Sequence, residues 1–349
     1  MKRNLGQRRW AFTLVELLVV IAIIGVLVGI LLPAVGVVRD RARMTQNITN
    51  LRSIGQALNA YEMQTKSYPP AVKVSRPNSN EPNTIDDRGK NYRERFYSTS
   101  WAFELLPYLD NANVHKQHDR LNVTYQQPFA FAVPIDTYAN PRRRDSEVDV
   151  PMEGGGPGGT SLDYAANGGY IWTGSTATWT EDPAMLQAMV LSPDVDLYTG
   201  KGSSGVPKEL QFNPKVSGPF TMDWNVRLSS ANARDGQSMT LAIGDRHVPI
   251  STATVVGSRA PQIMQDSAGL VGSSVYTIIR YMNAGSTEPG ANPLSTDPTD
   301  PSIYKFGTHI GDQIGFVYLD GHAEYLPSST DPKVLRRLAA INDGAVMPQ

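Results

Sequence analysis

The feature that most constrains this chain is an unbroken apolar run close to its N-terminus. Within residues 12–32 the only polar side chains are those of Thr13 and Glu16. Because an α-helix rises about 1.5 Å per residue, a helix of this length spans about 30 Å, the thickness of the hydrocarbon core of a bilayer. The run therefore predicts one transmembrane helix rather than an element of a water-soluble core.

The eleven residues before this run are basic, with Lys2, Arg3, Arg8 and Arg9 and no acidic residue. Positive charge near a membrane helix is retained in the cytoplasm, so we expect the N-terminus there and the rest of the chain outside. A secretory signal peptide has a shorter apolar region, followed by a small-x-small cleavage site. The segment is therefore interpreted as a single-pass signal-anchor.

Glu16 is the exception in the apolar run. A carboxylate within a bilayer costs a few kcal/mol, so it needs either a partner or access to water. One interpretation places Glu16 close enough to the membrane surface to stay hydrated. The alternative is a cationic partner within the membrane, and the neighbouring sequence indicates what that partner is.

The stretch Ala11-Phe12-Thr13-Leu14-Val15-Glu16, followed by about twenty apolar residues and Pro33, closely resembles the N-terminus of type IV prepilins and type II secretion pseudopilins. The resemblance implies that a prepilin peptidase cuts between Ala11 and Phe12 and methylates the new amino group. Glu16 would then pair with the amine of Phe12 on a neighbouring subunit, since opposite charges in lipid are tolerated when they neutralise each other. The family usually has glycine before the cut, where this chain has Ala11.

Beyond Pro33, which permits a kink, a stripe of apolar residues recurs at helical spacing: Met44, Ile48, Leu51, Ile54, Leu58 and Tyr61. The stripe predicts an amphipathic continuation of the helix over residues 39–66, packed on the protein's own sheet. A coiled coil with another chain is the alternative, but the stripe covers only about three heptads and Gly55 interrupts it. The helix should end before Tyr68-Pro69-Pro70.

Four parts are therefore expected: a leader (1–11), a transmembrane helix (12–38), its amphipathic continuation (39–66) and an extracytoplasmic head (67–349). The chain holds 30 glycines and 25 prolines, which favours loops and strands in the head. The predicted fold class is α+β, with a long pilin-type N-terminal helix packed on a mostly antiparallel, β-rich head. The net charge of −1 argues against nucleic acid as a partner, and the lack of cysteine excludes disulfides and cysteine nucleophiles.

Near the C-terminus, residues 314–319 and 322–326 have the composition of strands. Asp320-Gly321 between them predicts a two-residue hairpin turn with positive φ at both positions. In that register Val317 faces Glu324 and Phe316 faces Tyr325.

This region carries a second resemblance. A large bacterial family of undetermined function joins a prepilin-type N-terminus to a body that ends in His, nine residues and Asp-Gly. Here ten residues, not nine, separate His309 from Asp320-Gly321. Further stretches that look similar are residues 50–61, 68–71, Trp101, 106–109, 164–169 and 235–241. The resemblance marks Pro33, Asp235, Gly236, His309, Asp320 and Gly321 as structural motif residues.

Patterns for catalysis are weak in this sequence. Gly-x-Ser-x-Gly and His-Glu-x-x-His are absent. His322 and Glu324 share a strand face and could chelate a metal with His309, Asp312 or Asp320, but we interpret them as the polar face of an exposed hairpin. The stretches 152–160 (glycine-rich), 288–300 (acidic) and Arg142-Arg143-Arg144 are interpreted as solvated loops rather than phosphate, calcium or nucleic-acid sites. We therefore expect no catalytic residue, metal or cofactor.

The resemblance implies a pilin-like or pseudopilin-like subunit in the inner membrane, with its head in the periplasm. Its partners would be prepilin peptidase/methylase, the lipid bilayer, and like subunits that pack through the N-terminal helix of a type II secretion or type IV pilus-like assembly. A head of roughly 280 residues is bulky for close stacking. A membrane-tethered extracytoplasmic binding or surface protein that never polymerises is therefore the alternative. A minor or tip subunit is a compromise between the two, and an enzyme is the third choice.

Overall fold

The computed structural model describes residues 14–74, 98–118, 132–143, 159–169, 218–220, 227–248, 269–270, 278–280, 282, 293–300 and 305–341. The leader, with the cleavage residues Ala11 and Phe12, lies outside these residues, as do residues 152–158 and 288–292. In the described part of the acidic stretch, Leu294 and Ser295 form a buried strand, so the interpretation of the whole stretch as a solvated loop is wrong there. The chain divides into two compact units, Met1–Gln46 and Asn47–Gln349.

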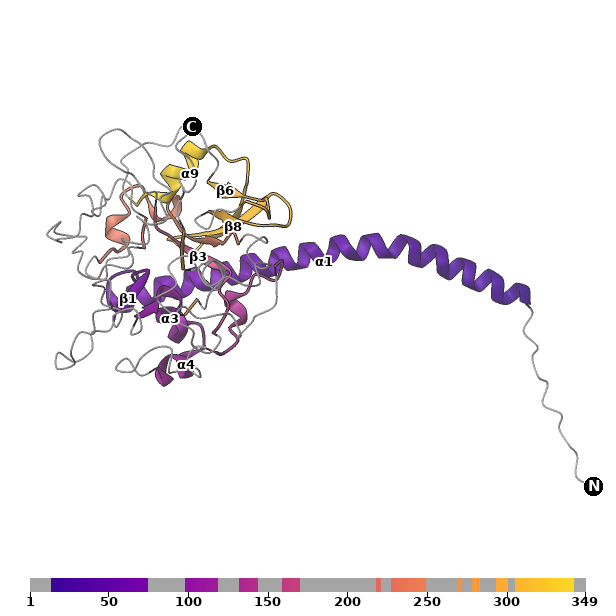
Figure 1. The fold of residues 1–349 in the computed structure, drawn as a ribbon, viewed down its shortest axis with the longest axis horizontal. Coiled ribbons are helices and arrows are strands. Elements are labelled where there is room, and N and C mark those ends of the chain that lie inside the picture. The colour runs from indigo at the N-terminus through magenta and orange to yellow at the C-terminus, as the bar shows by residue number, and fades with distance from the viewer. Residues whose placement is uncertain are drawn as a thin grey trace, which may run out of the picture. The chain divides into compact units, whose positions relative to one another are not determined.

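The longest element is helix α1, which runs from Leu14 to Thr65 (Figure 1). Pro33 lies inside it without ending it, because a proline removes one backbone hydrogen bond while its neighbours in a long helix keep theirs. The helix ends one residue before Lys66, whose φ is +62°. As predicted, it stops before Tyr68 and the two prolines that cannot continue it.

The C-terminal part of α1 is buried in the head along one stripe. Leu51, Ile54, Leu58 and Tyr61 are at most 7% exposed, which confirms the predicted amphipathic face, whereas Met44 and Ile48 are only partly buried. The stripe belongs to the main apolar core of the head, together with Trp101, Tyr138 and Val317. This part of the helix therefore packs against the protein's own head.

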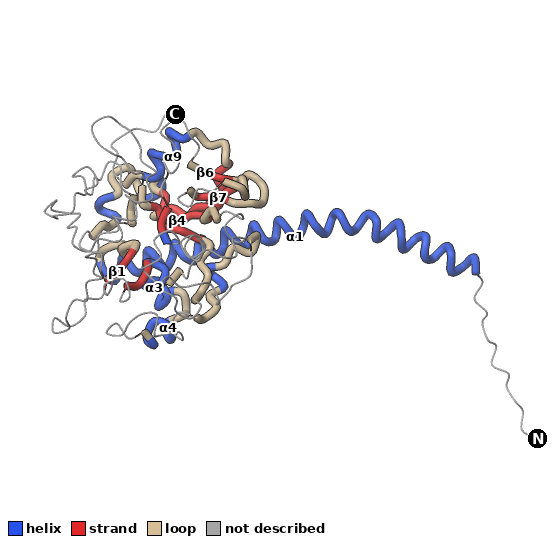
Figure 2. Tube along the Cα trace, in the orientation of Figure 1, coloured by secondary structure: helices blue, strands red, loops and turns tan. Residues whose placement is uncertain are grey.

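A sheet that contains β4 lies at the centre of the head (Figure 2). It has five strands in the order β5-β3-β4-β8-β9. The strands are β3 (Tyr164–Asn167), β4 (Leu241–Asp245), β5 (Ile279–Arg280), β8 (Gln313–Tyr318) and β9 (Ala323–Pro327). The pairs β3/β4, β4/β8 and β8/β9 are antiparallel, and β3/β5 is parallel. The prediction of an α+β fold with a mostly antiparallel sheet is confirmed.

Two small sheets and several short helices complete the described part of the head. β1 (Val72–Val74) pairs with β2 (Ser98–Ser100), and β6 (Leu294–Ser295) pairs with β7 (Phe306–Gly307). The helices are α3 (Trp101–Leu105), η1 (Leu106–Tyr108), α4 (Ala112–Gln117), η3 (Asp136–Tyr138), η5 (Ser230–Asn232), η6 (Gln237–Met239) and α9 (Pro332–Ala339).

Side chains of β8 alternate between two cores on opposite faces of the sheet, as the two-residue period of a strand requires. Val317 lies in the core that holds the stripe of α1. Ile314 and Phe316 lie in a second core with Leu335 and Leu338 of α9. The head therefore has three layers, in which the end of α1 and α9 cover opposite faces of the sheet.

The predicted hairpin at Asp320-Gly321 is present, but its predicted register is wrong by one residue. Val317 pairs with Ala323, and Phe316 pairs with Glu324. The Tyr318 amide donates to the His322 carbonyl at 2.9 Å, and the Gly321 amide donates to the Tyr318 carbonyl at 3.0 Å. The loop therefore has three residues, of which only Gly321 has positive φ. Asp-Gly fits this bulged turn as well as the two-residue turn, so the dipeptide alone could not decide between them.

Candidate functional site

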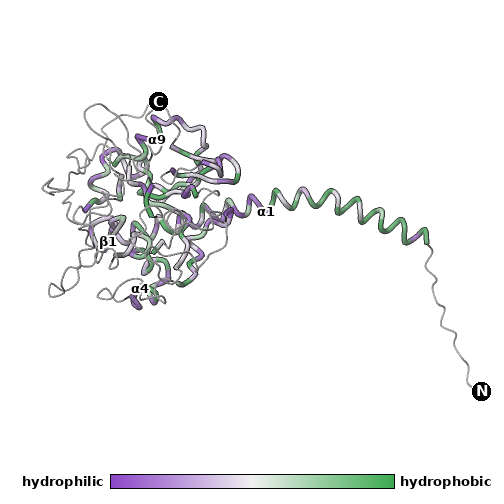
Figure 3. Tube along the Cα trace, in the orientation of Figure 1, coloured by the Kyte–Doolittle hydropathy of each residue, from purple (hydrophilic) through white to green (hydrophobic). Residues whose placement is uncertain are grey.

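The first candidate site is the apolar N-terminal part of α1. Every residue from Leu14 to Arg39 is exposed, including large side chains such as Ile30 and Leu32, each 69% exposed. The colour of the N-terminal part of α1 is mostly that of hydrophobic residues (Figure 3). The helix is long and apolar enough to cross a membrane. A helix that is apolar on all sides needs lipid or other helices around it, so this segment is consistent with a single-pass anchor.

Glu16 lies in the first turn of α1 as the structure describes it. A carboxylate at this position interacts favourably with the positive end of the helix dipole. The predicted partner, the amine of Phe12, lies outside the described residues. The pairing of the two across subunits stays a prediction.

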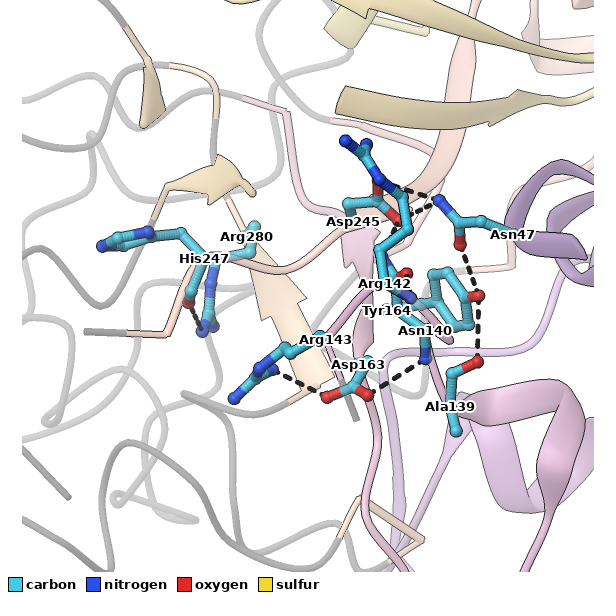
Figure 4. A network of polar contacts seen from close by, with 10 residues as sticks. All are labelled: Asn47, Ala139, Asn140, Arg142, Arg143, Asp163, Tyr164, Asp245, His247 and Arg280. Carbon is cyan, nitrogen blue, oxygen red and sulfur yellow. Dashed lines mark hydrogen bonds and ion pairs between the residues drawn. The ribbon is translucent and has the colours of Figure 1, made fainter. Parts of the chain in front are cut away.

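The second candidate site is a buried cluster of polar groups between α1 and the sheet, which we call the polar junction: Asn47, Asn140, Tyr164, Asp245, Gly315 and Tyr325. Its centre is the Asp245 carboxylate at the end of β4, which is 1% exposed. Oδ1 of Asp245 accepts hydrogen bonds from the amide groups of Asn47 and Asn140, both at 3.1 Å (Figure 4). Oδ2 accepts from the Gly315 N–H at 2.7 Å and from Asn47 at 3.1 Å.

Burial is the main influence on Asp245, and it raises the pKa of this carboxyl to about 7. The Gly315 N–H, the Asn47 amide and the Arg142 charge lower the pKa but do not offset burial. Desolvation disfavours the ionised form of a carboxyl, whereas donated hydrogen bonds favour it. Asp245 is therefore balanced between its two protonation states near neutral pH.

Asn47 joins α1 to three strands with one side chain. Its Oδ1 accepts the Tyr164 hydroxyl of β3 at 2.6 Å, and its Nδ2 donates to Asp245 of β4 and to the Tyr325 hydroxyl of β9 at 3.2 Å. Sequence analysis missed this residue. The available signal was that Asn47 and Asn50 lie on the same side of the helix as the apolar stripe; Asn50 is also buried and donates to the Ala139 carbonyl at 3.0 Å.

The loop that follows Ala139 closes the polar junction, and here the interpretation of the arginine run as solvated is wrong. Arg142 is only 4% exposed and donates to the backbone carbonyls of Gln313, at 3.1 Å, and Ile310. Arg143 pairs with the buried Asp163 carboxylate at 2.7 Å. The partners lie far away in the sequence, so local composition could not show them. Arg144 lies outside the described residues.

Pro33 lies in the exposed part of α1, and the other predicted motif residues lie in different parts of the head. Gly321, with φ +89°, packs against α1 at Gly55. Gly236, with φ +102°, precedes η6, and its carbonyl accepts the Thr240 hydroxyl at 3.1 Å. Asp235, beside it, is partly buried. The Asp-Gly motifs thus form turns that need the conformational freedom of glycine.

The histidine and acidic residues that were considered as a possible chelating group have other contacts. His322 pairs with Asp320 at 2.6 Å, and Glu324 accepts the Tyr318 hydroxyl at 2.6 Å. The ring of His309 instead packs against His247, 5.2 Å between centroids. In the part of the chain that the structure describes, no three His, Asp or Glu side chains are close enough together to hold a metal ion as they stand.

Comparison with known proteins gives one match. The model of the family described as "Protein of unknown function (DUF1559)" matches residues 37–333, which are 297 of the 349 residues. The match includes the polar junction, the bulged hairpin and both Asp-Gly turns. No curated protein and no solved structure matches the chain.

Proposed function

The chain belongs to the DUF1559 family of proteins of unknown function, and on this premise we propose that it is a membrane-anchored structural subunit of the type IV pilin or type II secretion pseudopilin kind. The observation that carries the proposal is the division of α1 into two surfaces. Its residues 14–39 are exposed and largely apolar, and its residues from Asn47 onward are packed into a folded head. One helix therefore has a part committed to the head and a part available to lipid and to other subunits.

The exposed part of α1 has features that suit contact between helices in a membrane. Gly25 and Gly29 are four residues apart, and nothing lies within 4 Å of a Cβ at either position. Small residues at this spacing let two helix backbones approach closely. We propose that like subunits pack along this face once they leave the bilayer.

Glu16 supplies the specific contact in this proposal. Cleavage between Ala11 and Phe12 by prepilin peptidase would create an amine four residues from the Glu16 carboxylate, and methylation by the same enzyme would keep the amine positively charged. Pairing the two charges between neighbours offsets the cost of holding each in an apolar environment. The expected location is the inner membrane, with the N-terminus in the cytoplasm before cleavage and the head outside.

The alternative is a tethered surface protein that never polymerises. The size of the head favours it, because a bulky head limits how closely neighbouring helices can stack. Both proposals use α1 as an anchor, but only assembly requires cleavage and the Glu16 carboxylate.

The first experiment is to determine the mass and the N-terminal sequence of the protein recovered from membranes. A chain that begins with methylated Phe12 supports the prepilin route, and one that begins with Met1 contradicts it. The second step compares Glu16→Ala with Ile24→Ala, which removes an apolar side chain from the same exposed segment. Both variants should insert, and only Glu16→Ala should fail to cross-link to like subunits. Wild type that does not cross-link to like subunits would favour the tethered alternative, and equal cross-linking of both variants would mean that Glu16 is not needed for the contact.

A further inference from the structure

Two histidines that are far apart in the sequence meet at one end of the sheet. His247 follows β4 and is fully buried, and His309 precedes β8 and is partly buried. Their rings lie edge to face, with centroids 5.2 Å apart. The main chain of His247 is held on both sides, because its amide donates to the Lys305 carbonyl at 3.3 Å and its carbonyl accepts from Arg280 at 3.2 Å (Figure 4).

Each of these two rings has a buried nitrogen without a hydrogen-bond partner. His247 Nε2 lies 2.9 Å from the Asp300 carbonyl oxygen. A carbonyl only accepts, so Nε2 carries the proton and Nδ1 carries a lone pair. This Nδ1 and the Nε2 of His309 are two of the seven buried side-chain nitrogen and oxygen atoms that have no hydrogen-bond partner in the described part of the chain. Buried polar atoms are nearly always paired, so two adjacent exceptions indicate that something else occupies their lone pairs.

The chemical state of both rings suits a metal ion. With Nε2 of His247 used by the Asp300 carbonyl at 2.9 Å, the Nδ1 lone pair is the atom of this ring that is left to bind an ion. Neutral imidazole is the form that binds metals. The bond from His247 Nε2–H to a backbone carbonyl is the outer contact that commonly orients a metal-bound histidine.

Carboxylate charge is available at the same place. The Asp297 carboxylate is exposed and interacts electrostatically with both His247 and His309. Its Oδ1 accepts the Thr299 amide at 2.8 Å and the Thr299 hydroxyl at 2.7 Å, and neither bond uses Oδ2. The nearby charge of Arg143, which opposes a cation, is compensated by its ion pair with Asp163 at 2.7 Å.

We propose that His247 Nδ1 and His309 Nε2 bind one divalent transition metal ion of the Zn²⁺ type, and that Asp297 closes on the ion as the third protein ligand. Two imidazoles and one carboxylate form a ligand set that such ions accept, with water in the remaining position. The two imidazoles are already in place, and the exposed Asp297 side chain moves to complete the set.

The experiment titrates the full chain, in detergent micelles and freed of metal with EDTA followed by dialysis, with ZnCl₂ in a calorimeter. Wild type should bind one Zn²⁺ per chain, and its unfolding temperature should rise with Zn²⁺ because only the folded state brings the ligands together. His309→Gln should weaken the affinity at least ~10-fold, and Asp297→Asn should weaken it to a smaller extent. His322→Gln is the matched control, because it removes an exposed imidazole and should leave the affinity unchanged.

Two calorimetric results would overturn the site: no saturable binding by wild type, or the same affinity in His309→Gln as in wild type, which would make the ion adventitious. Unfolding of each variant in EDTA shows whether it is folded before Zn²⁺ is added. Asp297→Asn changes only an exposed side chain, so it keeps the test valid if His309→Gln does not fold. The zinc X-ray absorption spectrum should show two imidazole ligands, and a spectrum without them would also overturn the assignment.

Discussion

Gly55 of α1 and Gly321 of the bulged hairpin turn lie against each other. A Cβ built at Gly55 would come within 3.0 Å of the Gly321 Cα and 2.6 Å of Val317 Cγ2. The end of the C-terminal motif is therefore a contact surface for the N-terminal helix. The positive φ at position 321 requires glycine, and so does the close approach of α1 at position 55 to the hairpin turn.

Gly55→Ala is expected to destabilise the head by about 1–3 kcal/mol, because the methyl group overpacks a buried contact. Alanine favours a helix over glycine by about 1 kcal/mol, so the net cost lies at the lower end of that range. Denaturant unfolding followed by tryptophan fluorescence measures it, since Trp101 is buried in the same core. Gly36→Ala is the control. Gly36 lies in the same helix, a Cβ added there would have nothing within 4 Å, and the substitution should not destabilise the head. A Gly55→Ala variant as stable as wild type would show that the contact is loose.

Asn47→Ala should destabilise the head by about 2–4 kcal/mol. It leaves the buried Asp245 carboxylate with fewer donors and removes the closer of the two acceptors of the Tyr164 hydroxyl, and each such loss costs about 1–3 kcal/mol. The same unfolding experiment applies. Thr49→Ala, an exposed substitution two residues away in the same helix, should change stability by less than about 0.5 kcal/mol. Equal effects of the two substitutions would mean that the polar junction contributes little to stability.

The raised pKa of Asp245 predicts a dependence of stability on pH. An aspartate in the unfolded chain loses its proton near pH 4, and Asp245 in the folded protein loses it at about 7. Between these values the folded state binds more protons, so the contribution of Asp245 falls as the pH rises, by up to about 1.4 kcal/mol per pH unit. The lowered pKa of His247 acts in the opposite direction: its contribution is complete above pH 6.5 and is lost as the pH falls toward about 4.

Comparison with Asp245→Asn separates these two effects, because the variant keeps His247. With EDTA present, the free energy of unfolding of wild type minus that of Asp245→Asn should decrease steadily from pH 4 to pH 7. A difference that stays constant over this range would mean that Asp245 has the same pKa in both states.

Replacing Gly25 and Gly29 together by leucine should leave membrane insertion intact, because the helix becomes more apolar. It should reduce self-association, because the two side chains keep the helix backbones apart. Chemical cross-linking of membranes measures the fraction of dimers and larger species. Val28→Leu, on the same exposed segment, is the matched control and should cross-link like wild type. An unchanged pattern in the double variant would place the contact on another face of α1.

The sequence by itself determined the elements whose signals are local. A long apolar run and a stripe at helical spacing predict α1 and its buried face, because both follow from the period of one helix. The hairpin at Asp320-Gly321 could also be predicted, because strand-like residues flank a turn dipeptide there. Such strand signals together with the long helix predict the α+β class. The register of that hairpin could not, because the choice between a two-residue and a bulged turn depends on how the strands twist and pack.

Only the tertiary structure decided which distant residues meet. Asn47 and Asp245 are 198 residues apart, and the sheet order β5-β3-β4-β8-β9 brings together strands that are not consecutive in the chain. The burial of Arg142 and the meeting of His247 with His309 follow from the same arrangement. These contacts depend on the three-dimensional path of the backbone, and no local period or composition records it, so the anchor could be predicted from the sequence but the polar junction and the histidine pair could not.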